Sequence, residues 1–231
     1  MFYAKIADMV IRIDNKYDYV ENMCRDYICP PTAPELVISV SDEDIAAESQ
    51  GENVSAAYLE TLAVYRKIST ELTKGDGLLM HGVVLEVDGK GIAFLADSGT
   101  GKTTHMTLWK KLLKDKCIVV NGDKPLIRIQ NETAYAYGTP WAGKEFIQTN
   151  TKVPLNNICF LERAKENSTF PLEKKDVLAQ LYSHIYLPRD GSLRLEIFDK
   201  LDKLISFSDF YTIRCNMDIS AAEVSYNTIM K

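Results

Sequence analysis

Apolar and polar residues alternate near the start of the chain, which is typical of a strand with one buried face. The alternation covers residues 3–13. The residues on the apolar face are Met9, Ile11 and Ile13. Residues 17–27 have the pattern of a short helix, and the proline-rich residues 29–34 predict the loop that ends it.

The pattern continues with a second short strand over residues 36–40 and a helix start at Ser41. Asp44 stands three residues after Ser41, in the place of the usual Glu of a capping box. Residues 50–53 predict a break, and residues 56–73 a long helix that ends at the glycines of residues 74–77. The stripe expected to be buried on this helix is Tyr58, Leu62, Tyr65 and Leu72.

The middle of the chain predicts a sheet with both strand directions. Residues 78–87 and 92–95 are apolar strands, and residues 88–91 form a tight turn between them, so the two strands are antiparallel. An amphipathic helix over residues 105–113 and a buried strand over residues 117–120 follow. The helix residues expected on one face are Met106, Trp109 and Leu113. This order favours an α/β fold with a mixed sheet over a doubly wound parallel one.

The remainder predicts further strands and helices. The elements expected are a hairpin over residues 126–129 and 133–137, a loop over 138–145, a strand over 153–161, helices over 172–186 and 193–207, and a strand over 210–215. The inward residues of the helix over 172–186 are expected to be Val177, Leu178, Leu181 and Ile185. Asp218 or Ser220 is expected to cap a final helix. We expect an N-terminal α+β lobe over residues 1–74, packed on a core domain over residues 75–231.

Composition narrows the class of protein. The 231 residues are 46% apolar and 26% charged, with a net charge of −5, which gives no reason to expect nucleic acid as a partner. No apolar run is long enough for a membrane span, and no signal-peptide pattern is present. The five cysteines include no Cys-x-x-Cys pair, so neither a zinc site nor a disulfide framework is expected. A reduced, cytoplasmic protein fits these features.

A glycine-rich turn between the strand at 92–95 and the following helix has the P-loop arrangement. Its residues are Ser98, Gly99, Thr100, Gly101, Lys102, Thr103 and Thr104. The glycines allow backbone N–H groups to point at phosphate oxygens, and the helix N-terminus adds partial positive charge. Lys102 is the expected cation for the outer phosphates of ATP, and the Thr103 hydroxyl is the expected Mg²⁺ ligand. A chance glycine turn before a helix is the alternative.

Asp123 comes directly after the buried strand at 117–120. An acidic residue at such a strand end is what the second magnesium motif of P-loop enzymes requires. Asp123 could hold Mg²⁺, directly or through water, or accept the proton of an attacking hydroxyl. The sequence leaves both roles open, beside the plain alternative of a solvated loop aspartate.

Together these residues resemble a known group of enzymes. The run from Ser98 to Thr104 is similar to the kinase-1 motif of ATP-dependent phosphoenolpyruvate carboxykinases. The order of a His-Gly-Val segment at His81, a glycine-turn hairpin, the P-loop and an acidic strand end resembles the catalytic domain of HPr kinase/phosphorylase. The resemblance covers about residues 75–220 and is greatest to short HPr-kinase-related bacterial proteins. It implies a P-loop fold with a mixed sheet, of the HPr kinase and carboxykinase type.

The chain departs from that pattern after the second motif. HPr kinases carry two adjacent aspartates there, whereas this chain has Gly122, Asp123 and Lys124. We therefore expect an acceptor other than HPr and no phosphorolysis. Lys124 would suit an acidic acceptor if it faces the site, and it could equally point to solvent.

Several other residues are candidates for the site. The resemblance implies that His81 contacts phosphate or accepts a proton, although a lone histidine in an apolar strand is often structural. Lys144, Glu145 and Arg163 could contact phosphate or substrate, or simply belong to a turn and a strand end. His105 and His184 are expected to be structural or at the surface.

These features predict an ATP- and magnesium-dependent kinase that transfers the γ-phosphoryl group to a hydroxyl of a small molecule or of a protein or peptide serine. The alternative is a regulatory module that senses ATP without turnover. A decarboxylating carboxykinase is disfavoured because the chain is too short for one. The oligomeric state is left open, with a homo-oligomer as one option.

Overall fold

A computed structural model describes residues 1–49 and 54–231. The predicted break over residues 50–53 lies outside the described residues. The strands are β1 (Phe2–Ile6), β2 (Met9–Asp14), β3 (Leu36–Ser39), β4 (Gly77–Leu79), β5 (Val83–Val87), β6 (Lys90–Leu95), β7 (Cys117–Asn121), β8 (Leu126–Gln130), β9 (Thr133–Tyr137), β10 (Lys152–Arg163), β11 (Ser168–Pro171) and β12 (Asp209–Cys215). The α-helices are α1 (Asp18–Met23), α2 (Asp42–Ala46), α3 (Ala56–Lys74), α4 (Lys102–Leu113), α5 (Leu178–Tyr182), α6 (Arg194–Phe207) and α7 (Ile219–Ile229). Short 3₁₀ turns are η1 (Arg25–Tyr27), η2 (Lys114–Lys116), η3 (Lys174–Asp176) and η4 (Gly191–Leu193).

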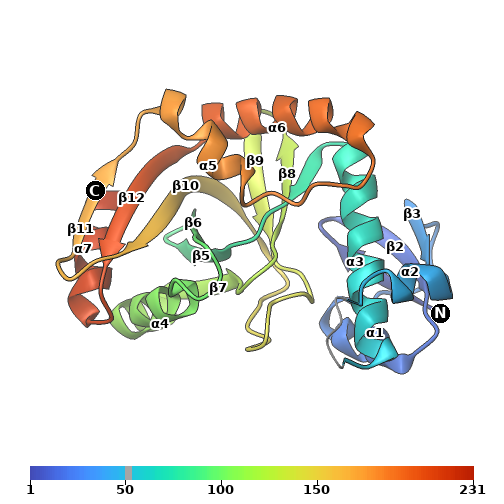
Figure 1. Ribbon diagram of the computed structural model, residues 1–231. Helices are drawn as coiled ribbons and strands as arrows, with labels where there is room; N and C mark the ends of the chain where they lie inside the picture. The colour runs from blue at the N-terminus through green and yellow to red at the C-terminus, as the bar shows by residue number, and fades with distance from the viewer. Residues whose placement is uncertain (50–53) are drawn as a thin grey trace.

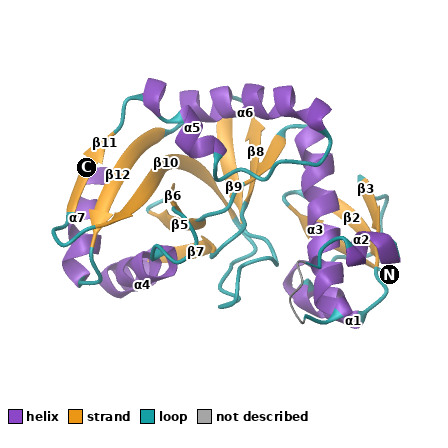
Figure 2. Ribbon diagram, in the orientation of Figure 1, coloured by secondary structure: helices purple, strands orange, loops and turns teal. Residues whose placement is uncertain are grey.

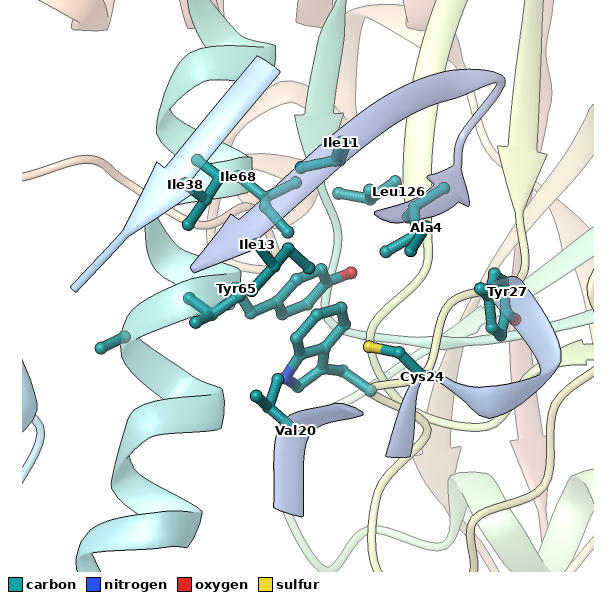
Figure 3. Close-up of a cluster of buried hydrophobic side chains, with 14 of the residues drawn as sticks. Ala4, Ile11, Ile13, Val20, Cys24, Tyr27, Ile38, Tyr65, Ile68 and Leu126 are labelled. Carbon is teal, nitrogen blue, oxygen red and sulfur yellow. The ribbon is translucent and has the colours of Figure 1, made fainter. Parts of the chain in front are cut away.

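The N-terminal part is a three-stranded sheet packed against the long helix α3 (Figure 1). The single strand predicted over residues 3–13 is wrong, because Ala7 and Asp8 form a turn with φ of 52° and 64° that folds β1 and β2 into an antiparallel hairpin. β3 pairs with β2 in the parallel direction. Ile11 and Ile13 are buried as expected, and they lie with Ile38 and Ile68 in one cluster (Figure 3). This cluster fastens the small sheet to α3.

The predicted start of α2 is confirmed, whereas the predicted buried face of α3 is confirmed only in part. Ser41 and Asp44 form the expected capping box at the start of α2. Tyr65 and Leu72 on α3 are buried, but Tyr58 is 41% exposed. The long helix is covered from several sides, since α1, α2, β3 and β4 all contact it, so a single stripe could not describe its buried face.

The second sheet is mixed, as predicted. Its order is β4-β8-β9-β10-β6-β5-β7, and β12 and β11 continue it from β10. The long strand β10 pairs in parallel with β6 and β12, whereas its pairing with β9 and all other neighbouring pairs in this sheet are antiparallel. The hairpin predicted around residues 88–91 is present, with Asp88 and Gly89 at its tip.

Helices cover both faces of this sheet (Figure 2). Along β5 and β6, residues alternate between two hydrophobic cores, one shared with α5 and α6 and one shared with α4 and α7. Phe94 belongs to the α4 side, and its neighbours Ala93 and Leu95 belong to the α6 side. Strands buried on both faces read as continuous apolar runs, which is the pattern these segments show.

The strand predicted over residues 78–87 is two strands. β4 pairs with β8 and β5 pairs with β6 and β7, so residues 80–82 cross from one part of the sheet to another. Gly82 leaves room at this crossing for Leu95, because a Cβ on residue 82 would lie 2.3 Å from a Leu95 side-chain carbon and would force that side chain to shift. Apolar residues flank His81 and Gly82 on both sides, so the whole segment resembled one strand.

The C-terminal part also differs from expectation. The helix predicted over residues 172–186 is limited to η3 and α5, and the preceding strand β11 was missed. Val177, Leu181 and Ile185 are buried as expected, whereas Leu178 is 39% exposed. Asp218 is the N-cap residue of α7, without a side-chain hydrogen bond to the helix.

The N-terminal part and the second sheet share contacts and core residues. Arg128 of β8 donates to the carbonyl of Ala7 at 2.7 Å, and Leu126 belongs to the N-terminal core (Figure 3). A domain boundary after residue 74 stays a prediction. All five cysteines are free thiols, and no helix of the described residues is both long and apolar enough to cross a bilayer.

Candidate active site

The glycine loop, residues 96–101, joins β6 to α4. Gly99 and Gly101 have φ of 80° and 125°, the left-handed region that glycine adopts without strain. The Thr100 N–H donates to the carbonyl of Asp97 at 3.2 Å, which closes the turn. Ser98 and Gly99 are exposed. The loop therefore presents its backbone and the N-terminus of α4 at the end of a buried strand.

Lys102 begins α4 and lies largely under the loop. Its Nζ donates to the carbonyl of Ala96 at 2.7 Å, and the residue is 9% exposed. Burial lowers the pKa of the Lys102 ammonium, while the nearby carboxylates of Asp123 and Asp97 act to raise it. Thr103, the expected Mg²⁺ ligand, is exposed on the first turn of α4. Lys102 and Asp123 thus lie close enough to influence each other.

The loop after β7 is fastened by Asn121, which is fully buried. The Asn121 Oδ1 accepts from the N–H groups of Asp123 at 2.9 Å and Lys124 at 2.7 Å. Its Nδ2 donates to the carbonyl and the hydroxyl of Thr139. One side chain therefore sets the backbone of the segment that carries Asp123.

Two hydroxyl groups hold the same segment from the other side. Tyr65 of α3 and Thr139 both donate to the carbonyl of Lys124, at 2.5 and 2.9 Å. Tyr65 in turn stacks on Trp141, with ring centroids 4.0 Å apart and an interplanar angle of 5°. The N-terminal part of the chain therefore helps to position the candidate site.

Asp123 lies between two cationic or proton-bearing groups. Its Oδ1 is 3.4 Å from His81 Nε2, and its Oδ2 accepts from the Lys124 ammonium. Burial acts to raise the pKa of Asp123, but the His81 hydrogen bond and Lys124 outweigh it, and the pKa falls to about 2. The carboxylate is ionised at neutral pH. Lys124 points toward the site and not into solvent alone.

His81 lies at the crossing between β4 and β5, so its predicted place inside a strand is wrong. Its side chain is 42% exposed, and its backbone N–H donates to the carbonyl of His184 at 2.7 Å. The neighbouring Gly82 N–H donates to the carbonyl of Asp123 at 2.9 Å. His184 is buried, and burial, together with nearby His81 and Lys102, lowers its pKa. The crossing brings His81 to Asp123, 42 residues later in the sequence.

The loop over residues 138–145 has a buried base and an exposed tip. Thr139 and Trp141 are buried, and Gly143, with φ of 77°, lets the loop approach Asp123, since a Cβ there would lie 3.0 Å from the Asp123 Cβ. Lys144 and Glu145 are at the exposed tip and form no ion pair or hydrogen bond with another described residue. The structure therefore does not bring these two side chains to Asp123.

Arg163 ends β10 and lies at the glycine loop. Its guanidinium donates to the carbonyls of Gly99 and Thr100, the latter at 3.1 Å. The side chain therefore binds the loop backbone, a contact that the sequence did not indicate. The other predicted histidine, His105, is buried within α4 and accepts from Trp109 Nε1 at 3.1 Å, which makes it structural.

The side chains near Asp123 can be compared with the ligands that Mg²⁺ requires. No cluster of three or more His, Cys, Asp or Glu side chains suited to a metal is formed by the described residues. Mg²⁺ in phosphate sites commonly takes one or two protein oxygens and fills its shell with phosphates and water. The Asp123 carboxylate and the Thr103 hydroxyl are oxygen donors of this kind, and Lys124 now pairs with Asp123.

Three residues that fasten the site were missed from the sequence. Asn121 had a usable signal, because an Asn before Gly-Asp commonly binds the backbone two residues on. Thr139 and Tyr65 carried no local signal, since they are 15 and 59 residues from Lys124 in the chain.

Comparisons with known proteins give a family model and a set of solved structures. A family model described as "ScmC: SynChlorMet cassette protein ScmC" matches residues 47–186. No curated protein matches the chain. The solved Hpr(Ser) kinase/phosphatase from Coxiella burnetii is similar with 13% identity and a TM-score of 0.38, over 66% of this chain and 96% of that chain. This TM-score is below that of chains sharing one overall fold.

Proposed function

The chain belongs to the family of the SynChlorMet cassette protein ScmC, and for this member we propose an ATP- and magnesium-dependent kinase of the HPr-kinase-related, P-loop type. It transfers the γ-phosphoryl group to a hydroxyl of a small molecule or of a protein or peptide serine. The proposal rests on one observation: the glycine loop and Lys102 lie next to a half-buried Asp123 that pairs with His81.

The parts divide the work of phosphoryl transfer. Backbone N–H groups of the glycine loop and the positive end of α4 bind the phosphates, and Lys102 leaves the Ala96 carbonyl for their outer oxygens. Transfer of this kind depends mainly on positioning and charge neutralisation. When bound, Mg²⁺ neutralises phosphate charge, with Asp123 and Thr103 as its expected protein ligands.

In the transfer step, the acceptor oxygen forms a bond to the γ-phosphorus as the bond from that phosphorus to the β–γ bridging oxygen breaks. ADP leaves with the electron pair of the broken bond. The hydroxyl proton passes to His81 Nε2 or to the Asp123 carboxylate, which lie 3.4 Å apart. Both groups stay candidates for the base.

The test is a turnover assay with ATP and Mg²⁺ over a panel of hydroxyl metabolites and serine-containing peptides, with phosphorylated products identified by mass spectrometry. We expect one class of acceptor to gain phosphate, and Asp123→Asn to abolish this turnover while some metal-independent nucleotide binding remains. Near-normal turnover of Asp123→Asn at saturating Mg²⁺ would contradict the assigned site.

The choice of acceptor has its own test. Lys124 stands where HPr kinases carry a second aspartate, and its ammonium pairs with Asp123. We expect no phosphoserine on HPr after incubation with ATP and Mg²⁺. We also expect no transfer of the phosphoryl group from phosphorylated HPr to inorganic phosphate, a reaction that would leave free serine and pyrophosphate. Efficient reaction in either direction would place the chain with HPr kinases in activity.

A sensing module that binds ATP without turnover is the second candidate. It is favoured by the Lys124–Asp123 pair, which places an ammonium where a metal would bind. Tight ATP binding with no product for any acceptor, and no ADP released, would support it.

A further inference from the structure

A groove of about 600 Å³ lies between the edge strand β3 and helix α3, on the N-terminal part of the molecule. All four residues of β3 line one side, and Ala63, Arg66, Lys67 and Thr70 of α3 line the other. Tyr186 and Arg189, from the segment that leads into α6, close one end. In Figure 1 this segment runs past the upper end of α3, and β3 stands beside the helix.

The outer edge of β3 is open to this groove. Among the described residues, β3 pairs with β2 and with no other strand. The Glu35 N–H donates to the carbonyl of Val10 at 2.8 Å, on the β2 side. Because backbone groups alternate sides along a strand, those of Leu36 and Ile38 face away from β2. An open edge of this kind is a template for one further strand.

The two cations that α3 contributes to the groove, Arg66 and Lys67, are already paired with carboxylates, and Arg189 at its end donates to the carbonyl of Ala47 at 3.2 Å. Glu48, whose side chain is 4% exposed, accepts from the Arg66 guanidinium, with Nη2 to Oε2 at 2.6 Å. The same guanidinium lies 5.2 Å from the centre of the Tyr186 ring. Lys67 pairs with Asp44. These cations are engaged, so the groove favours a ligand that binds through its neutral backbone over a small anion.

The groove is also connected to the candidate active site. Tyr186 donates its N–H to the carbonyl of Leu79 at 2.9 Å, two residues before His81. His184, two residues before Tyr186, accepts from the His81 N–H at 2.7 Å. Backbone hydrogen bonds therefore join the segment that closes one end of the groove to the segment that carries His81.

We propose that the groove docks an extended polypeptide segment, which adds a fourth strand to the edge of β3. That this segment belongs to the phosphoryl acceptor rests on the proposed kinase function; the docking itself does not. Backbone hydrogen bonds to Leu36 and Ile38 supply the affinity, and the α3 side of the groove receives the side chains that face it. The acceptor is then a peptide or protein.

The test begins with random linear peptides displayed on phage and selected on the full chain. A matched pair of variants separates groove binding from other binding. Thr70→Trp fills the groove from α3, whereas Thr228→Trp makes the same change on an exposed position of α7. Both threonines donate to the carbonyl four residues earlier in their helices, at 2.8 and 3.0 Å. Circular dichroism and thermal melting check that both variants fold.

We expect selected peptides to lose at least about tenfold in affinity with Thr70→Trp and to bind Thr228→Trp as they bind the original chain. Each selected peptide is made in two N-methylated forms, one methylated at its odd positions and one at its even positions. One form should lose binding and the other should keep it, since only every second N–H faces β3. Lys102→Ala should leave binding unchanged, so failure of the kinase proposal would not affect this result.

Two results would overturn the proposal. One is a selection that enriches no peptide over counter-selection with Thr70→Trp. The other is a set of peptides whose odd-position and even-position N-methylated forms bind equally well, because a ligand held by side chains alone adds no strand. If peptides bind but none is phosphorylated, the result supports peptide binding in the groove and contradicts the assignment of that peptide as the phosphoryl acceptor.

Discussion

The two loops that carry the candidate site are built in opposite ways. The glycine loop after β6 is held mainly through its backbone, by its own turn and by Arg163 on two of its carbonyls. The loop after β7 is held by the buried side chain of Asn121 and by the hydroxyls of Tyr65 and Thr139. The glycine loop has an exposed tip at Ser98 and Gly99 and uses the Thr100 N–H to close its own turn, whereas the second loop fixes a carboxylate before any ligand arrives. Changes in the first should alter binding, and changes in the second should alter stability as well.

The largest effect on binding is expected from Lys102→Ala. Its ammonium now donates to the carbonyl of Ala96 at the start of the glycine loop, so its loss should weaken MgATP binding by about a hundredfold, or about 2–3 kcal/mol. Calorimetry on a variant with an unchanged melting curve measures this. Unchanged affinity would remove the glycine loop as the nucleotide site.

For the second loop, Asn121→Ala should lower stability and turnover together. The change leaves the N–H groups of Asp123 and Lys124 without their acceptor, at a cost of about 2–4 kcal/mol in the free energy of unfolding. Urea denaturation measures the cost. Asn156→Ala is the control, because Asn156 accepts one long bond of 3.3 Å from Gly91, and it should cost less than about 1 kcal/mol. Equal costs would mean that Asn121 does not organise the loop.

The helix behind the glycine loop should make stability depend on pH through His105. Burial lowers the pKa of His105 from 6.5 to about 4 in the folded chain. Its contribution is therefore complete above pH 6.5, and it declines as the pH falls toward 4, because only the unfolded chain takes up the proton. At pH 5 the loss is about 2 kcal/mol.

Urea denaturation at pH 7 and pH 5 measures this loss in the original chain and in His105→Gln, whose side chain does not titrate. The variant should be less stable at pH 7 and should lose less stability on acidification. The same loss in both proteins would assign the pH dependence to other groups.

The smallest effect is expected from Arg163→Ala. The guanidinium binds the carbonyls of Gly99 and Thr100 from the end of β10, so its removal should loosen the loop and weaken ATP binding by about fivefold, with little change in stability. Arg214→Ala is the matched control, since Arg214 lies on the adjacent strand β12 and pairs with Glu162. Identical affinities of both variants would show that Arg163 does not support the loop.

The sequence was informative where the relevant contacts are local. The glycine turn between strand and helix, the hairpin at Asp88 and Gly89, and the capping box at Ser41 each depend on residues within a few positions of one another. The mixed sheet followed from the same hairpin, because a short turn requires antiparallel strands. The apolar runs of β5 and β6 were predicted as strands, and the structure shows that both are buried on two faces.

The strand predictions were wrong where a turn or a crossing had the same local apolar pattern as a continuous strand. The turn at Ala7 and Asp8 places Ala7, a residue type that seldom adopts left-handed backbone, at a φ of 52°, so the two strands were predicted as one. Residues 80–82 are apolar on both sides, so the crossing that brings His81 to Asp123 also read as continuous strand. In both cases the pairing of strands determines where one strand ends and the next begins, and local sequence does not specify that pairing.

The amino-acid sequence by itself determined the glycine loop, the position of Asp123 at a strand end and the two strand directions of the sheet. Only the tertiary structure decided that Lys124 pairs with Asp123, that Arg163 binds the glycine loop and that Tyr65 holds the second loop from the N-terminal part. It also decided that β3 ends its sheet beside α3 with one edge open. The physical reason is range: turns, caps and periodicity act over a few residues, whereas these contacts join segments that meet only after the sheets and helices have packed.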